Sequence, residues 1–236
     1  GVAVIFITHK LREVLAIADK IEVLRSGKVV GTTTPAEADQ AKLAQMMVGR
    51  SVLLSVEKSI SSPKEIVLDV VGLSSDSDIG LPAIRNVDLT VRSGEIVGIA
   101  GVEGNGQREL VEALTGIRKS TATKFTVNDE NAIGAGPHEI HGMHVGHVPE
   151  DREKDGLVAQ YSIANNMVLN RFDEPEFSRR GIRNMDAVNS HATKLVKDFD
   201  VRTPSIKTPA NSLSGGNKQK VVIARELSAN PSLLIA

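Results

Sequence analysis

Toward its C-terminal end the chain reads Leu213-Ser214-Gly215-Gly216-Asn217-Lys218-Gln219-Lys220, and a helical pattern containing Ala and Arg follows. A serine directly before such a pattern is typical of a helix N-cap. The small residues after it leave the backbone amides of the first helical turn uncovered, and those amides and the helix dipole attract an anion. The stretch therefore predicts a phosphate-facing helix start, although Ser214 would serve an ordinary N-cap equally well.

A glycine-rich loop lies upstream, between the apolar run 96–100 and a helical pattern at 108–114. The loop reads Gly101-Val102-Glu103-Gly104-Asn105-Gly106-Gln107-Arg108. Strand, glycine loop and helix in this order are typical of phosphate-binding α/β proteins, because the glycines let backbone amides converge on phosphate oxygens. The pattern then expects Lys, for the phosphates, and Ser or Thr, for magnesium. Gln107 and Arg108 stand there instead, so the sequence predicts a degenerate phosphate loop.

Two other interpretations of this loop stay open. A glycine-rich turn between a strand and a helix can be no more than a tight connection. A dinucleotide-binding fingerprint fits less well, because Glu109 occupies the place of its third glycine. If the loop is a phosphate loop, Arg108 cannot ligate its cation, and the missing lysine removes a charge-assisted contact to phosphate.

The glycine loop and the 213–220 stretch together resemble the phosphate loop and the signature motif of ABC transporter ATPases. Pro149-Glu150-Asp151-Arg152 and Ile163-Ala164-Asn165-Asn166 narrow the similarity to the tandem ATP-binding subunits of simple-sugar and nucleoside importers. This resemblance implies an α/β fold, the P-loop ABC ATPase fold, with an antiparallel β edge and a helical subdomain at about residues 157–210.

The same resemblance implies that the chain is truncated at both ends. Residues 1–56 would be the C-terminal remnant of a first ABC domain, residues 57–64 a linker, and residues 65–236 a second ABC domain lacking its C-terminal part. The apolar runs 2–7 and 96–100 are predicted to be buried parallel strands. Residues 2–7 are also expected to complete the sheet of the second domain, within one chain or by strand exchange in a homodimer.

Site residues follow from the resemblance as well. Glu150 stands where most ABC domains carry a glutamine that contacts magnesium and the attacking water. His9 matches the family's histidine that senses the γ-phosphate, although a lone histidine after a strand can be a surface residue. The resemblance places ATP on Gly101, Glu103, Gly104, Asn105, Gly106, Gln107 and Arg108 of the loop and on Ser214, Gly215, Gly216 and Asn217 of the signature. No residue is assigned as a dedicated metal ligand.

Function is implied accordingly. The subunit would bind ATP, with Mg²⁺ held poorly at the degenerate site, and would drive membrane permease subunits to import a nucleoside or simple sugar. It would work as a peripheral protein at the cytoplasmic face of the cell membrane. Because the carboxylates that complete catalysis are not in the sequence, little or no hydrolysis is expected. The alternative is a non-hydrolytic regulatory or scaffold module.

Composition narrows the remaining classes. The 28 Lys and Arg residues against 29 Asp and Glu give a formal net charge of -1, so no global basic field exists to hold nucleic acid. There is no cysteine, which excludes disulfides and thiolate chemistry. His138, His141, His144 and His147 would align as a metal site on a helix, but the intervening glycines favour turn and strand.

Overall fold

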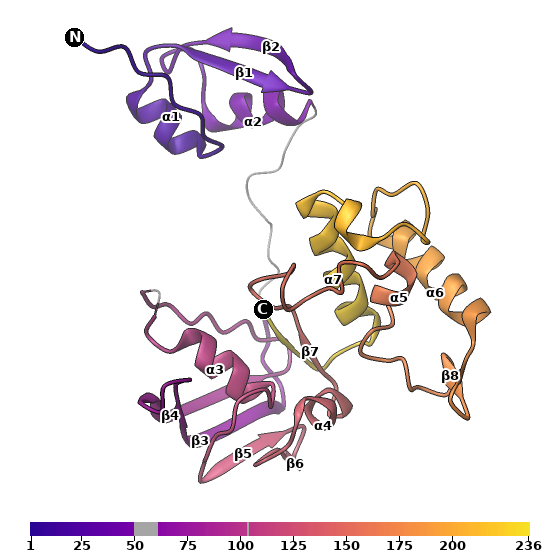
Figure 1. Ribbon diagram of the computed structural model, residues 1–236. Helices are drawn as coiled ribbons and strands as arrows, with labels where there is room; N and C mark the ends of the chain where they lie inside the picture. The colour runs from indigo at the N-terminus through magenta and orange to yellow at the C-terminus, as the bar shows by residue number, and fades with distance from the viewer. Residues whose placement is uncertain (50–60, 103) are drawn as a thin grey trace. The chain divides into compact units, whose positions relative to one another are not determined.

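The computed structural model describes residues 1–49, 61–102 and 104–236, and the chain divides into two compact units, residues 1–60 and 61–236. The smaller unit consists of α1 (Leu11–Ile17), β1 (Ile21–Arg25), β2 (Lys28–Thr33) and α2 (Gln40–Val48) (Figure 1). The two strands pair antiparallel around a tight turn at Ser26 and Gly27, both with positive φ. The helix α2 ends at Gly49, which takes the left-handed conformation that glycine favours.

The larger unit is built on an antiparallel sheet with strand order β4-β3-β5-β6. Its strands are β3 (Ile66–Asp76), β4 (Pro82–Arg92), β5 (Lys124–Val127) and β6 (Glu130–Asn131), and α3 (Gln107–Leu114) packs against it (Figure 1). Leu68, Leu73 and Val127 of the sheet are buried together with Ala113 and Leu114 of α3. The sheet and α3 therefore share one hydrophobic core, which fixes the start of α3 beside the glycine loop.

A second core lies within the helical part of the same unit. Its elements are α5 (Ile163–Asn166), α6 (Met185–Asp198), the 3-10 turn η1 (Ala210–Ser212) and α7 (Gly215–Ser228), with a small hairpin of β8 (Ser178–Arg179) and β9 (Ile182–Arg183). Phe177, Val188 and Val221 are fully buried in it. A short parallel pair, β7 (Val145–His147) and β10 (Leu233–Ile235), follows α4 (Pro137–Gly142) and contacts α7 through β7.

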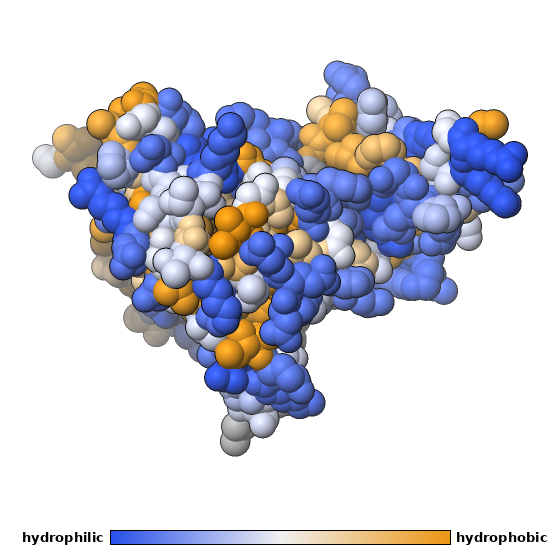
Figure 2. All heavy atoms as spheres, turned by 90° about the horizontal axis from the view of Figure 1, so that it is seen from below, coloured by the Kyte–Doolittle hydropathy of each residue, from blue (hydrophilic) through white to orange (hydrophobic). Residues whose placement is uncertain are grey.

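Two predicted strands are wrong. Residues 2–7 and 96–100 form no strand, and their apolar side chains are largely exposed, with Ile5 at 93% and Ile96 at 76%. A strand needs a neighbour to satisfy its backbone groups, and neither run pairs with any residue that the structure describes. Figure 2 shows apolar surface in several separate patches on the face that it presents.

The prediction of turn and strand around the histidines is correct only in part. Residues 137–142 form α4, which carries His138 and His141, whereas His144 lies in a left-handed turn and His147 in β7. Within the described ranges no group of three or more acidic, histidine or cysteine side chains is placed to hold a metal ion. Of the described helices, none has the length and apolar character that a membrane crossing requires.

Candidate functional site

The Ser214 turn forms the exposed start of α7. Ser214 is the N-cap residue in extended conformation, and the amide of Lys218 donates to its carbonyl at 2.9 Å, which closes the first helical turn. The Ser214 side chain makes no capping hydrogen bond to the first amides of this helix. Ser214 and Gly216 are exposed to solvent, whereas Leu213 is buried just before them. The first turn of α7 thus presents backbone amides and positive dipole potential outward.

The Asn217 side chain forms hydrogen bonds that stabilise this turn. Its side-chain amide donates to Ser214 Oγ at 3.0 Å, and its carbonyl oxygen accepts from the backbone amide of Arg202 at 2.8 Å. The serine hydroxyl is therefore fixed by a side chain and not by the helix amides. The Asn217 side chain therefore links the turn at Ser214 to the backbone at Arg202.

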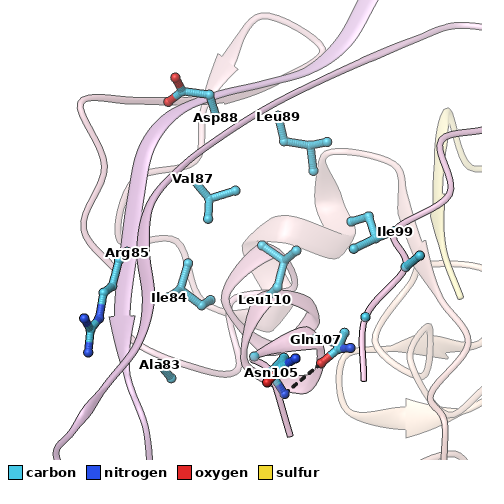
Figure 3. A pocket seen from close by; sticks show the side chains of 13 residues that line it. Ala83, Ile84, Arg85, Val87, Asp88, Leu89, Ile99, Asn105, Gln107 and Leu110 are labelled. Carbon is cyan, nitrogen blue, oxygen red and sulfur yellow. Dashed lines mark hydrogen bonds between the residues drawn. The ribbon is translucent and has the colours of Figure 1, made fainter. Parts of the chain in front are cut away.

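The glycine loop is filled by one of its own side chains. Gln107 donates from Nε2 to the Val102 carbonyl at 3.0 Å. Its Oε1 accepts from the Asn105 amide at 3.1 Å, the bond that Figure 3 marks with a dashed line. Its Nε2 also occupies the space that a Cβ at Gly101 would take. The carboxamide therefore uses a backbone donor that a phosphate-binding loop would direct at its ligand.

Glycine is required at the junction of this loop with α3. Gly106 has φ of +97°, and a Cβ there would lie 2.9 Å from the Ala83 carbonyl oxygen. A hollow of about 410 Å³ lies beside the loop and is lined by residues of β4 and α3. Ile84, Val87 and Leu110 point into it (Figure 3). The lining is mostly apolar, and its polar side chains are Asn105 and Gln107 at the loop and Arg85 and Asp88 of β4.

Arg108 is bound along its own helix. Its Nε donates to Glu112 Oε1 at 2.7 Å, and Arg118 donates from Nε to the other oxygen of Glu112 at 2.8 Å. Burial raises the pKa of Glu112, but the hydrogen bonds from Arg108 and Arg118 outweigh it, so the pKa lies below the ordinary value. Neither Arg108 nor the occupied Gln107 offers an oxygen ligand where the phosphate-loop pattern expects one, so the loop does not fit Mg²⁺.

The turn that follows β7 carries four charged residues, Glu150 to Glu153. Asp151 Oδ1 accepts the amides of Glu153 at 3.0 Å and Lys154 at 3.1 Å. These backbone hydrogen bonds hold the pKa of the Asp151 carboxyl below its ordinary value. Glu153 pairs with Lys218 of α7 at 2.9 Å, and Glu150 is exposed.

A buried ion pair lies deeper between the same elements. Arg225 Nε contacts Glu226 Oε1 at 2.7 Å, and the two residues are 5% and 3% exposed. Glu226 also accepts the His147 amide at 3.1 Å and the Asn170 side-chain amide at 3.2 Å. Burial lowers the pKa of His147, with Glu226 opposing that shift and Arg225 adding to it.

The predicted residues fall into separate groups. Gly101, Gly104, Asn105, Gly106, Gln107 and Arg108 lie together at the start of α3, and Ser214, Gly215, Gly216 and Asn217 at the start of α7. Glu103 lies outside the described residues. His9 is exposed in the smaller unit, which is described by itself.

Sequence reasoning did not identify the side chains that connect the turn after β7 to α7 or that pair within α7. Arg152, Glu153, Arg225 and Glu226 became visible only through their contacts with α7 or within it. An adjacent Arg and Glu inside the apolar pattern of a helix is a signal that could have pointed to the buried pair.

The sequence is similar to a known protein family and to several import proteins. The sequence profile of the family described as ABC transporter matches residues 84–236. The Nucleoside import ATP-binding protein NupA of Lactococcus lactis is 43% identical over 100% of this chain and 46% of the relative. The Glucose import ATP-binding protein TsgD13 of Haloferax volcanii is 44% identical over 100% of this chain and 43% of the relative. This chain therefore spans less than half the length of these relatives.

Solved structures agree on the fold. The dimeric ATP-binding cassette MJ0796 bound to ADP and Pi superposes with a TM-score of 0.58 and 22% identity, over 71% of this chain and 72% of that one. CbiO1 from Clostridium perfringens, part of the transporter complex cbiONQ, gives a TM-score of 0.54 at 20% identity, over 72% of this chain and 64% of that one. The predicted α/β fold class is confirmed by these likenesses.

Proposed function

This chain belongs to the ABC transporter family, and from that premise we propose that it is part of an ATP-binding, energy-coupling subunit that drives a membrane permease. The import of a nucleoside or simple sugar is the activity we propose for the whole subunit, since its relatives are named for nucleoside, guanosine, glucose and ribose import. Its place would be the cytoplasmic face of the membrane, attached through the permease. ATP would be its nucleotide.

One observation carries this proposal: the exposed start of α7. Ser214 and Gly216 are exposed, the Ser214 side chain makes no capping hydrogen bond, and Asn217 fixes the Ser214 hydroxyl in place. A helix of 14 residues with an open N-terminus provides the partial positive charge that a terminal phosphate needs. In the proposed subunit this turn meets ATP that is held by the loop of a partnering cassette, head to tail.

Residues 65–236 would form one cassette and residues 1–56 would belong to another, joined by residues 57–64. The proposed roles of His9 and Glu150 in catalysis depend on this arrangement, and so does the completion of a sheet by residues 2–7, within one chain or by strand exchange in a homodimer. Neither 2–7 nor 96–100 is a strand in the described structure, and their exposed apolar side chains favour pairing only if a further backbone becomes available. Disulfide crosslinking between cysteines introduced at Val4 and Ile99 tests this pairing, and no crosslink above that of a Val2–Ile79 control pair would refute it.

The loop of the larger unit is proposed to be the weak nucleotide site. Gln107 already satisfies the Asn105 amide and the Val102 carbonyl, so a phosphate would have to displace it. Arg108 is committed to Glu112 and supplies no magnesium ligand. We therefore expect little or no ATP hydrolysis from this chain. The same contacts favour a second candidate for this unit, a non-hydrolytic scaffold whose loop does not hold nucleotide.

Calorimetric titration with ATP and Mg²⁺ separates the two candidates. The variant Gln107→Lys with Arg108→Ser restores the charge and the hydroxyl, and Gln107→Ala only empties the loop. Gln160→Lys adds the same charge at an exposed position of the helical part and serves as the control.

Measurable affinity in the unmodified chain supports an energy-coupling cassette. Affinity that appears only in the loop variants supports the scaffold. The filled-loop argument fails if Gln107→Ala and the double variant bind no better than Gln160→Lys. Phosphate release well above background from the unmodified chain would contradict the expected lack of turnover.

A further inference from the structure

The segment after β7 lies along α7 and is held to it at both ends. At its start Glu153 pairs with Lys218 of the first helical turn, and the Lys218 side chain is only 15% exposed. At its end the Gly156 carbonyl accepts a hydrogen bond from Arg225 Nη1 at 2.9 Å. A Cβ at Gly156 would lie 3.1 Å from Val222 and 2.7 Å from the Arg152 carbonyl oxygen, so the approach is close.

Arg152 adds a contact at the start of the helix. Its Nη2 lies 2.9 Å from the position that a Cβ of Gly215 would occupy, so the guanidinium rests against the bare backbone of that glycine. Its Nε is buried and has no hydrogen-bond partner among the residues that the structure describes. Packing against the helix start, together with the neighbouring Glu153–Lys218 pair, is therefore what positions this side chain.

We propose that Arg152 and Glu153 are positioning residues that hold the turn at 150–153 and the first turn of α7 together, so that the two move as one piece. This inference rests on the proposed function. There, Glu150 would serve the nucleotide of its own cassette and Ser214 the nucleotide of the partnering one. Any shift of α7 on nucleotide binding would then be carried to Glu150 through these contacts.

Amide hydrogen exchange on the whole 236-residue chain tests this coupling without nucleotide. Glu153→Gln should speed exchange at the amides of 218–221, and Lys218→Gln should speed exchange at 153–156. Each change should be about two- to fivefold, the range expected for a partly exposed ion pair. The charge-swapped variant Glu153→Lys with Lys218→Glu should restore both rates.

Arg152 is tested in the same experiment. Arg152→Ala should speed exchange at 218–221, and Arg152→Lys should not restore it, because an ammonium lacks the flat guanidinium that lies on Gly215. The amides of α6 serve as the reference within the chain, and Lys20→Ala, which removes an exposed pair with Glu22, is the control variant.

The proposal is overturned if exchange changes only on the mutated side, or if α6 exchanges faster by the same factor. Charge swapping without restoration would also overturn it. Because no nucleotide is present, these outcomes do not depend on ATP binding. If the chain shows this coupling but binds no ATP, the proposed energy-coupling function is refuted, whereas the contact between residues 150–153 and α7 is still supported.

Discussion

Replacing Glu226 with alanine should be among the most destabilising single changes in the larger unit. Glu226 is 3% exposed and its partner Arg225 is 5% exposed, so the variant leaves a buried guanidinium without its counter-charge. Removing one member of a buried pair costs about 3–5 kcal/mol. The His147 amide also loses its acceptor, at about 1 kcal/mol. The expected loss of unfolding free energy is therefore about 4–6 kcal/mol.

The chain offers a selective probe for this measurement. It has no tryptophan and a single tyrosine, Tyr161, which lies in the larger unit. Tyrosine fluorescence during urea unfolding therefore reports that unit alone, and the midpoint multiplied by the slope gives its stability. Asp198→Ala, at an exposed pair on α6, is the matched control and should cost no more than about 0.5 kcal/mol.

A second variant keeps the test informative if the alanine variant does not fold. Glu226→Gln preserves the shape and an acceptor oxygen while removing the charge, so it should cost about 1.5–3 kcal/mol, less than the alanine change. A Glu226→Ala variant as stable as Asp198→Ala would refute the assignment of Arg225 and Glu226 as a buried ion pair within α7. Equal losses for Gln and Ala would refute the charge as the cause.

Three further outcomes are expected. Gly116→Ala should lower the free energy of unfolding by about 1–3 kcal/mol, because φ at this position is +73° and the new Cβ would lie 2.6 Å from the Ala135 carbonyl oxygen. An unchanged midpoint of urea unfolding would refute this. Leu73→Ala should cost about 2–5 kcal/mol, since Leu73 is 0% exposed, and thermal unfolding checks it against the exposed Leu81→Ala. The folded state holds the pKa of Glu112 below its ordinary value, so its stabilisation is present above the unfolded-state pKa and is lost as pH falls through the folded-state pKa. Glu112→Gln should therefore flatten the acid limb of a stability-against-pH curve, and an unaltered limb would contradict the assignment.

Local sequence was sufficient where neighbouring residues decide the conformation. The helix at 40–48 is bounded by Asp39, whose side chain accepts the Lys42 amide, and by Gly49 in the left-handed region. Ser214 likewise begins α7 at the position that its place before the two glycines predicts. Caps and turns depend on only a few consecutive residues, so these features can be inferred without knowledge of the fold.

For two apolar runs the same reasoning failed. The runs 2–7 and 96–100 have the apolar composition of buried parallel strands, yet neither is a strand in the described structure. Composition states only that a run would gain from burial. Whether it forms a strand depends on a neighbouring backbone that accepts and donates its hydrogen bonds, and that neighbour is remote in sequence.

By itself the sequence determined the family, the order of the loop and signature along the chain, and the loss of Lys and Ser or Thr from the phosphate loop. Only the tertiary structure decided that the Gln107 side chain fills that loop, that Arg152 rests on Gly215, and that Arg225 and Glu226 are buried as a pair. The physical reason is the difference in sequence separation between the interacting residues. Residue type and spacing fix local backbone geometry, whereas the partner of a charge or carboxamide depends on which distant segments the folded core brings within a few ångströms.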